Sequence, residues 1–304
     1  MLNLNETQTR KQLIDRALAV AGWDVTMRTH VGVEIPADGF SAQAWQVLRN
    51  QIKESGLPLD VKLPAGICDY VLYRENGEVL AVVEAKRTSI DPRLGQAQTR
   101  FYVEEIERRQ SFRPFGFMSN GLDTYFYDVG RAAERQVYGF FSRADLENLL
   151  YLRQNAAPLT QVPINTAIVD RTYQHEALRR VSETFEQGKR RVLLVMATGT
   201  GKTRTAMALI DLFMRSNQAR RILFVADRDA LTQQALDDGF QAHIPHEPCV
   251  RIYSETATTV QGARLFAVTL QTLSQCYQAF SPGFFDLIIF DEVHRSIFNK
   301  WNEP

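Results

Sequence analysis

The chain has 304 residues, of which 45% are hydrophobic and 23% are charged, and its formal net charge is zero. This length predicts two domains, each able to bury its own core, and the zero net charge confines any nucleic-acid-binding surface to a local patch. Three widely separated cysteines, Cys68, Cys249 and Cys276, argue against a disulfide framework or a Cys-rich zinc site and favour a reducing, cytoplasmic setting. The charged N-terminus is unlike a signal peptide, and no apolar run reaches membrane-spanning length, so no membrane partner is expected.

The first predicted element is an amphipathic helix over residues 5–21. Asn5 and Gln8 have the spacing of a capping box. Glu6 at the helix start has two interpretations: a partner of the helix dipole, which we favour, or an additional metal carboxylate. A second helix is expected over residues 41–53.

A β-hairpin follows, with strand-forming residues over 67–73, an Asn-Gly turn within 74–78, and a return strand over 79–86. Glu84 and Lys86 are two residues apart and therefore share one face of the strand, and Asp69 on the partner strand can lie beside them. Two carboxylates suit a hard divalent cation such as Mg²⁺, and the amine suits the orientation or activation of an attacking water. The hairpin therefore predicts a metal-dependent catalytic site.

The residues Asp69 and Glu84-Ala85-Lys86 resemble the PD-(D/E)xK nuclease superfamily, with Cys68 in place of the name-giving proline. A Glu-x-Lys pattern alone also occurs by chance in exposed strands. The next predicted helix, residues 94–109, places Gln98 and Tyr102 four residues apart on one face. This Gln-x-x-x-Tyr helix resembles the R subunits of type I restriction enzymes and related helicase-nucleases, which implies that both side chains support the nuclease site. A solvated helix face is the alternative for the pair.

Two further strands, 115–118 and 122–127, flank an Asn-Gly turn, and a helix is predicted over 143–153. Residues 156–167 contain Pro158 and Pro163 and few charges, which indicates an inter-domain linker. The predicted domains are therefore residues 1–155 and residues 168–304.

The second predicted domain contains a phosphate-binding loop. An apolar run over 192–195, expected to be a strand, leads into Met196-Ala197-Thr198-Gly199-Thr200-Gly201-Lys202-Thr203, and helix-forming residues follow. Its glycines free backbone N–H groups to surround phosphate oxygens, Lys202 adds a cation for the β- and γ-phosphates, and the Thr203 hydroxyl can bind Mg²⁺. Met196 replaces the usual first glycine of the pattern. The loop predicts binding of ATP and Mg²⁺.

Strands and helices then alternate: strands are expected over 221–226, 251–253, 265–269 and 286–290, and helices over 229–237 and 271–279. This order predicts a mostly parallel sheet. The last strand runs into Asp291-Glu292-Val293-His294, which resembles the DExH box of superfamily 2 helicases. The resemblance implies that Asp291 holds Mg²⁺, Glu292 polarises the attacking water, and His294 couples the site to the next motif.

Two other resemblances to superfamily 2 helicases concern nucleotide and DNA. Gln174, preceded by an aromatic residue, resembles the adenine-reading Q motif, with a helix-surface glutamine as the alternative. The segments 227–229 and 269–272 resemble DNA-contacting helicase motifs.

Together these features predict an α/β protein: a PD-(D/E)xK restriction-endonuclease-like domain followed by one RecA-like, parallel-sheet P-loop domain. The order nuclease then motor resembles type I restriction R subunits. This implies cleavage of double-stranded DNA after ATP-driven translocation, in complex with methyltransferase (M) and specificity (S) subunits. Because the chain ends soon after the DExH box, we also expect a missing second motor domain and deficient ATP hydrolysis. The alternatives are a superfamily 2 helicase-nuclease of DNA repair or another defence system, or a module that binds ATP or DNA without turnover.

Overall fold

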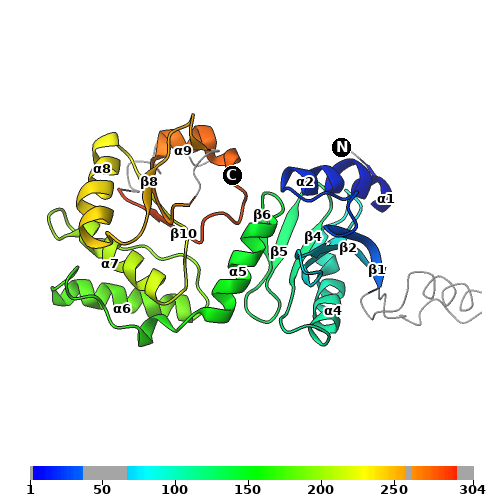
Figure 1. Cartoon of the computed structure of the whole chain (residues 1–304), viewed down its shortest axis with the longest axis horizontal. Coiled ribbons are helices and arrows are strands. Elements are labelled where there is room, and N and C mark those ends of the chain that lie inside the picture. Colours follow the sequence, from blue (N-terminus) through cyan, green and yellow to red (C-terminus); the bar gives the residue numbers. More distant parts are fainter. Residues whose placement is uncertain (1–2, 37–66, 258–261, 293–304) are drawn as a thin grey trace, which may run out of the picture. The chain divides into compact units, whose positions relative to one another are not determined.

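The computed structural model describes residues 3–36, 67–257 and 262–292, so the predicted helix over 41–53 and His294 lie outside the described residues. The chain divides into two compact units, Met1–Glu147 and Asn148–Pro304 (Figure 1). The division falls inside helix α5 (Arg143–Asn155), before the predicted linker. Within that linker, Leu159 is buried in the core of the second unit, because a short 3₁₀ turn, Leu159–Gln161, packs it there.

The first unit is built on a six-stranded mixed sheet with the order β1-β2-β3-β4-β5-β6. The strands are β1 (Val31–Pro36), β2 (Ile67–Tyr73), β3 (Val79–Ala85), β4 (Phe115–Ser119), β5 (Thr124–Tyr127) and β6 (Arg135–Val137). Neighbours are antiparallel except β3 and β4, which are parallel and are joined through helix α4 (Gln96–Glu107). The predicted β2–β3 and β4–β5 hairpins are therefore confirmed, whereas β1 and β6 lacked a clear signal in the sequence.

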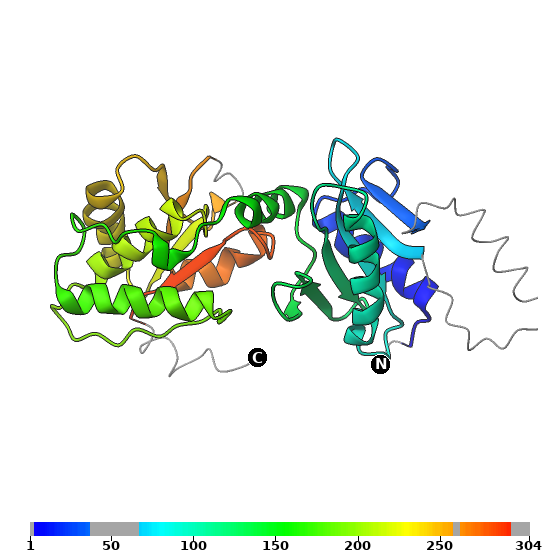
Figure 2. The same cartoon turned by 90° about the horizontal axis from the view of Figure 1, so that it is seen from below.

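Helices pack on this sheet according to the alternation of its side chains. Helix α4 buries Tyr102 and Val103 against Val82 of β3, and in Figure 2 it runs as a teal helix alongside the strands. Phe117 of β4 points to the opposite side, where its ring packs edge-on against Phe141, 5.5 Å away. Both faces of the central strands are thus covered, which explains their almost continuous burial.

The N-terminal helix has a wide turn in its middle. It consists of α1 (Glu6–Thr9), a π-helical turn (Arg10–Ile14) and α2 (Asp15–Val20). The predicted capping box is confirmed: the Asn5 side chain accepts from the Gln8 backbone, and the Gln8 side chain accepts from Asn5 N.

The second unit contains a four-stranded sheet with the order β10-β7-β9-β8, and all its pairs are parallel, as predicted. The strands are β7 (Ile222–Ala226), β8 (Cys249–Arg251), β9 (Leu265–Thr269) and β10 (Leu287–Phe290). The helices are α6 (Thr172–Glu186), α7 (Lys202–Arg215), α8 (Asp229–Gln234) and α9 (Leu270–Cys276), with a π-helical turn (Ala235–Gln241) after α8 and a 3₁₀ turn (Tyr277–Ala279) after α9.

One expectation for this unit is wrong: the apolar run over 192–195 is not a strand. Its side chains are exposed, Leu193 to 76% and Val195 to 88%. The physical reason is that none of the four described strands pairs with this segment, so its backbone has no ladder to join.

Candidate functional site

The predicted carboxylates of the first unit lie on adjacent strands. The register pairs Tyr70 with Val83 in the antiparallel β2–β3 ladder, so the next position along sets Asp69 opposite Glu84. Asp69 is fixed by its own backbone contact, because its Oδ2 accepts a hydrogen bond of 2.8 Å from Ala85 N. The sheet therefore brings the two residues to one place, as the hairpin predicted.

Lys86 completes the group. Its backbone N–H donates to Ser119 O at 2.8 Å, which extends the β3–β4 ladder by one residue and holds Lys86 on the same face as Glu84. Its Nζ donates to Glu84 Oε1 at 2.5 Å and to Gln98 Oε1 of α4 at 2.7 Å. We call Asp69, Glu84, Lys86 and Gln98 the carboxylate–lysine site.

Glu84 is deeply buried, with 3% of its surface exposed. Desolvation, followed by the negative charge of Asp69, raises its pKa to about 7, while Lys86 acts in the opposite direction. Desolvation also raises the pKa of Asp69, against the contacts from Ala85 N and Arg10. Asp69 and Glu84 are both desolvated and repel each other, so a bound cation would lower the electrostatic cost of ionising them.

Gly95, just before α4, lets the helix approach this site closely. A Cβ there would lie 2.7 Å from Glu84 Cγ and 3.3 Å from Lys86 Cε. Its φ of −81° is open to any residue, so the glycine is required for space and not for backbone conformation. The space beside Glu84 thus depends on the absence of a side chain at residue 95.

The donor set fits a hard divalent cation, since both carboxylates supply oxygen ligands. Among the described residues no three His, Cys, Asp or Glu side chains converge as a metal site, so further ligands would be water or substrate oxygens. Glu6 is exposed, but partial desolvation and the charge of Asp69 raise its pKa, which indicates that it lies near the site. The helix-dipole role stays the favoured interpretation of Glu6, and a ligand role stays the alternative.

The predicted helix pair separates in the structure. Gln98 reaches Lys86, whereas Tyr102 is 1% exposed and packs with Val71 and Met118 beneath the strands. Gln98 therefore contacts a site residue directly, and Tyr102 belongs to the core that supports the strands.

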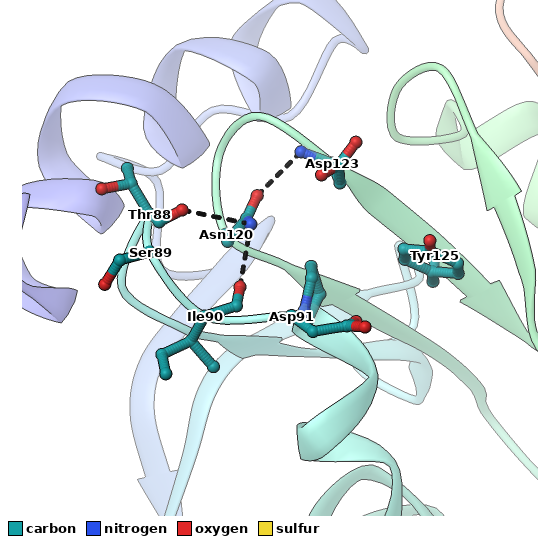
Figure 3. A pocket seen from close by; sticks show the side chains of 8 residues that line it. Thr88, Ser89, Ile90, Asp91, Asn120, Asp123 and Tyr125 are labelled. Atoms are coloured by element: carbon teal, nitrogen blue, oxygen red, sulfur yellow. Dashed lines mark hydrogen bonds between the residues drawn. The ribbon is translucent and has the colours of Figure 1, made fainter. Parts of the chain in front are cut away.

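The first unit also has a pocket of about 270 Å³, lined by residues 88–92 of the segment after β3 and by Asn120, Asp123 and Tyr125. Its wall is organised by Asn120, whose Nδ2 donates to Ile90 O at 2.9 Å and whose Oδ1 accepts from Asp123 N at 2.8 Å (Figure 3). The Asn120 amide thus ties the β4–β5 turn to the loop after β3. None of the predicted catalytic side chains lines this pocket.

In the second unit, the phosphate loop has the backbone that its glycines predict. Gly199 and Gly201 have φ values of +77° and +83°, in the left-handed region. Gly201 is the N-cap of α7, so Lys202 and Thr203 begin the helix and its positive end faces the loop. The Thr200 hydroxyl closes the turn by donating to Ala197 O at 2.6 Å, while Thr198 is exposed.

Two side chains of helix α6 contact this loop. Gln174 is 2% exposed, and its Nε2 donates to Thr205 Oγ1 at 3.2 Å and, more weakly, to Thr200 O and Gly201 O. Tyr173 Oη also donates to Thr200 O, at 2.8 Å. The structure therefore places the Gln174 amide nitrogen on the loop itself, and pairing with adenine stays a prediction.

The acidic pair follows β10, next to the same loop. Glu292 Oε1 accepts from Lys202 Nζ at 2.8 Å, and Glu292 has a left-handed φ of +57°. Desolvation, followed by the charge of Glu292, raises the pKa of Asp291. The structure thus joins the two ends of the predicted nucleotide site, 90 residues apart in sequence, through one ion pair. We call these residues with the loop the phosphate-loop site.

Three residues at or beside the first site were missed by sequence reasoning: Gly95, Arg10, whose guanidinium contacts both Asp69 and Glu34, and Glu34 itself. Arg10 lies among ordinary helix residues, and its role depends on the wide π-helical turn, which no sequence pattern announces. Glu34 lies on the unpredicted strand β1. Gly95 was detectable only as a glycine just before a helix, a position with many explanations.

Two family models match the chain: "Type I restriction enzyme R protein N terminus (HSDR_N)" over residues 50–135, and "Type III restriction enzyme, res subunit" over residues 167–303. The EcoAI endonuclease subunit of a type I restriction enzyme from Escherichia coli is 30% identical over 96% of this chain and 36% of its own length. The EcoKI endonuclease subunit of E. coli K12 is 28% identical over 97% of this chain and 29% of its own length. The chain therefore spans about a third of the length of these curated relatives.

A solved fragment from Vibrio vulnificus YJ016, described as an HsdR subunit of a type I restriction enzyme, aligns with 97% of this chain and 52% of its own length. Its identity is 24% and its TM-score is 0.37. In the described part of the chain, no helix has both the length and the apolar character that a membrane crossing requires.

Proposed function

Because the chain belongs to the family of type I restriction enzyme R subunits, we propose that it carries the DNA-cleaving centre and the nucleotide-binding half of the motor of such an enzyme. The observation that carries the proposal is the contact of Lys86 Nζ with both Glu84 and Gln98, beside Asp69. The predicted nuclease residues come from β2, β3 and α4 and meet only through folding. In this proposal the first unit is the PD-(D/E)xK domain and the second is the first RecA-like domain.

At the carboxylate–lysine site, Asp69 and Glu84 would hold a divalent cation, which supplies Lewis acidity toward a phosphodiester when bound. Lys86 has a rigid position, set by Glu84 and Gln98, from which its ammonium can orient a water and offset charge developing on a phosphoryl oxygen. Gln98 fixes the direction of the Lys86 amine, and Gly95 keeps α4 out of the space beside Glu84. Exposed Arg87 is the next residue and is suited to a DNA phosphate.

At the phosphate-loop site, the backbone of Gly199 to Thr203 and the Lys202 amine would hold the phosphates of ATP, with Thr203 and Asp291 toward Mg²⁺. Lys202 would exchange Glu292 for the nucleotide, which frees Glu292 to polarise water. Tyr173 and Gln174, which donate to Thr200 O and to Thr205 Oγ1, would hold the loop and the start of α7 in place during this exchange. The proposed substrate is double-stranded DNA, and the proposed partners are the M and S subunits.

The test is cleavage of duplex DNA by the complete enzyme containing this chain, assembled with its M and S subunits, with Mg²⁺ and ATP. Glu84→Gln and Asp69→Asn keep the size of each side chain and remove a metal-binding charge, so cleavage should fall at least about 10³-fold while ATP hydrolysis is unchanged. Glu104→Gln, on the exposed side of α4, is the matched control and should cleave normally. Undiminished cleavage by Glu84→Gln would overturn the assignment.

A second candidate function is favoured by one observation, the exposed run before the phosphate loop. A module that binds ATP or DNA without turnover would tolerate a loop that no described strand supports. Single-turnover measurement of ATP hydrolysis by the complete enzyme containing this chain, with and without DNA, separates the two functions, because the 304-residue chain alone is expected to be deficient in hydrolysis under either. DNA-stimulated turnover supports the motor, whereas binding without turnover supports the module.

A further inference from the structure

Arg10 connects two carboxylates of the first unit. Its Nη1 donates to Asp69 Oδ1 at 2.9 Å, and its Nη2 donates to Glu34 Oε1 at 2.7 Å. The other Asp69 oxygen accepts from Ala85 N, so Oδ1 is the oxygen left for an external ligand. A protein cation therefore sits on the Asp69 oxygen that is not tied to the backbone.

Two elements bring these residues together: the N-terminal helix and the β1–β2 pair. Arg10 begins the π-helical turn, and the extra residue in that turn lets both Arg10 and Asp15 reach β2, where Asp15 Oδ1 accepts from Tyr70 Oη at 2.7 Å. On the other side, the β1–β2 register pairs Val33 with Tyr70 and Ile35 with Cys68. Residue 34 therefore falls opposite Asp69.

Three carboxylates thus follow one another across three strands: Glu34 on β1, Asp69 on β2 and Glu84 on β3. Each end of the row has its own cation, since Arg10 lies between Glu34 and Asp69 while Lys86 contacts Glu84. The two partners of Arg10 differ in burial: the side chain of Asp69 is 14% exposed and that of Glu34 is 61% exposed. Glu34 also has φ +56°, a conformation that a glutamate seldom adopts.

We propose that Arg10 is a resident counter-cation that competes with the metal ion for Asp69, and that Glu34 retains Arg10 when the metal binds. This rests on the proposed nuclease function. A guanidinium and a divalent cation on the same carboxylate oxygen repel each other, so metal binding requires Arg10 to withdraw. Because Glu34 already holds the second guanidinium nitrogen, Arg10 keeps a partner and pays no penalty for an unpaired charge.

A simpler role for Arg10 predicts the opposite sign. If Arg10 only held Asp69 in place for the metal, its removal would let the carboxylate rotate and would weaken metal binding. Competition predicts tighter binding on removal. The sign of the change in affinity therefore separates the two roles, with no need for a cleavage assay.

The experiment measures Mn²⁺ binding to the 304-residue chain by electron paramagnetic resonance of free Mn²⁺, without nucleotide, in an Asp291→Asn background that removes the other predicted metal carboxylate. Arg10→Met should bind Mn²⁺ roughly tenfold more tightly. This factor is at the lower end of the effect that one charge at this distance has on the proton affinity of a neighbouring group. Arg10→Lys keeps the charge and should stay within about twofold of the parent. Arg100→Met, an exposed arginine paired with Glu104, changes the net charge equally and should change nothing.

Glu34 is tested by a double-mutant cycle. Glu34→Gln leaves Arg10 with Asp69 alone and should weaken Mn²⁺ binding about threefold, and this effect should shrink when Arg10 is already methionine. Thermal unfolding checks that each variant folds; should Arg10→Met not fold, Arg10→Gln and the Glu34→Gln arm decide. The proposal would be overturned if Arg10→Met binds Mn²⁺ as tightly as the parent or more weakly and Glu34→Gln binds Mn²⁺ as tightly as the parent. Absence of any Mn²⁺ binding that Asp69→Asn removes would instead overturn the proposed nuclease site.

Discussion

The two candidate sites differ in what supports them. The carboxylate–lysine site rests on adjacent strands that are paired on both sides and on a helix packed across them, so its side chains are fixed by the sheet register. The phosphate-loop site follows a segment without a strand, and its described support comes from Gln174, Tyr173 and the start of α7. One site is therefore held by backbone ladders, and the other mainly by individual side-chain contacts, which are easier to exchange.

The largest effects should separate the two lysines. Lys86→Met should reduce DNA cleavage by the complete enzyme on the order of 10³-fold and leave ATP hydrolysis intact, because in the proposed mechanism the ammonium acts only at the cleaved phosphodiester. Lys202→Met should abolish detectable ATP binding, since the loop loses its only mobile cation for the phosphates. Cleavage gels and titration with a fluorescent ATP analogue measure the two. Loss of nucleotide binding by Lys86→Met would show that the sites are not independent.

Gly95→Ala tests whether the first site depends on close packing. The new Cβ would lie 2.7 Å from Glu84 Cγ, so Glu84 must shift, and cleavage should fall on the order of 10²-fold. The global fold should survive, because the φ of residue 95 suits alanine. Ala97→Ser, on the exposed side of the same helix, is the control. A normal cleavage rate in Gly95→Ala would mean that Glu84 is free to adjust.

Gln98→Ala should have a smaller effect, with cleavage reduced about tenfold, as expected for a residue that orients another. Gln98 Oε1 fixes Lys86 Nζ at 2.7 Å without touching the metal carboxylates itself. Gln98→Glu restores an acceptor and should recover most of the rate. If the alanine variant cleaves at the wild-type rate, the Glu84–Lys86 contact is sufficient by itself.

The smallest expected effect is a pH dependence of stability in the absence of metal. Because the folded-state pKa of Glu84 is about 7, above its ordinary value of 4.5, the folded protein keeps a proton that the unfolded chain loses within this window. Stability should therefore decline as pH rises from about 4.5 to about 7. Thermal unfolding of Glu84→Gln should lack this part of the slope, and 1 kcal/mol corresponds to about 2–4 °C in domains of 150–250 residues. An identical slope in both proteins would contradict the raised pKa.

The sequence predicted the hairpins and the parallel sheet because each depends on local patterns: alternation, Asn-Gly turns and strand–helix order. It also predicted Asp69, Glu84 and Lys86 as neighbours, since period-two alternation fixes the face of a strand. Arg10 and Glu34 escaped prediction because a π-helical turn and a strand register bring them together across long sequence distances. The apolar run over 192–195 was misassigned for a related reason: strand propensity is local, whereas a strand exists only with a neighbour.

The exposed run over 192–195 also affects the solubility of the chain. Leu193 and Val195 are exposed to solvent, as are Ile288 and Phe290 on β10, which is an edge strand of the described sheet. An edge strand can pair with strands of other molecules, and exposed apolar segments favour association. The purified chain should therefore self-associate at high concentration, and overexpression should place much of it in inclusion bodies. A polar replacement at Leu193 or Val195 should improve the yield of dispersed protein and leave the carboxylate–lysine site unchanged.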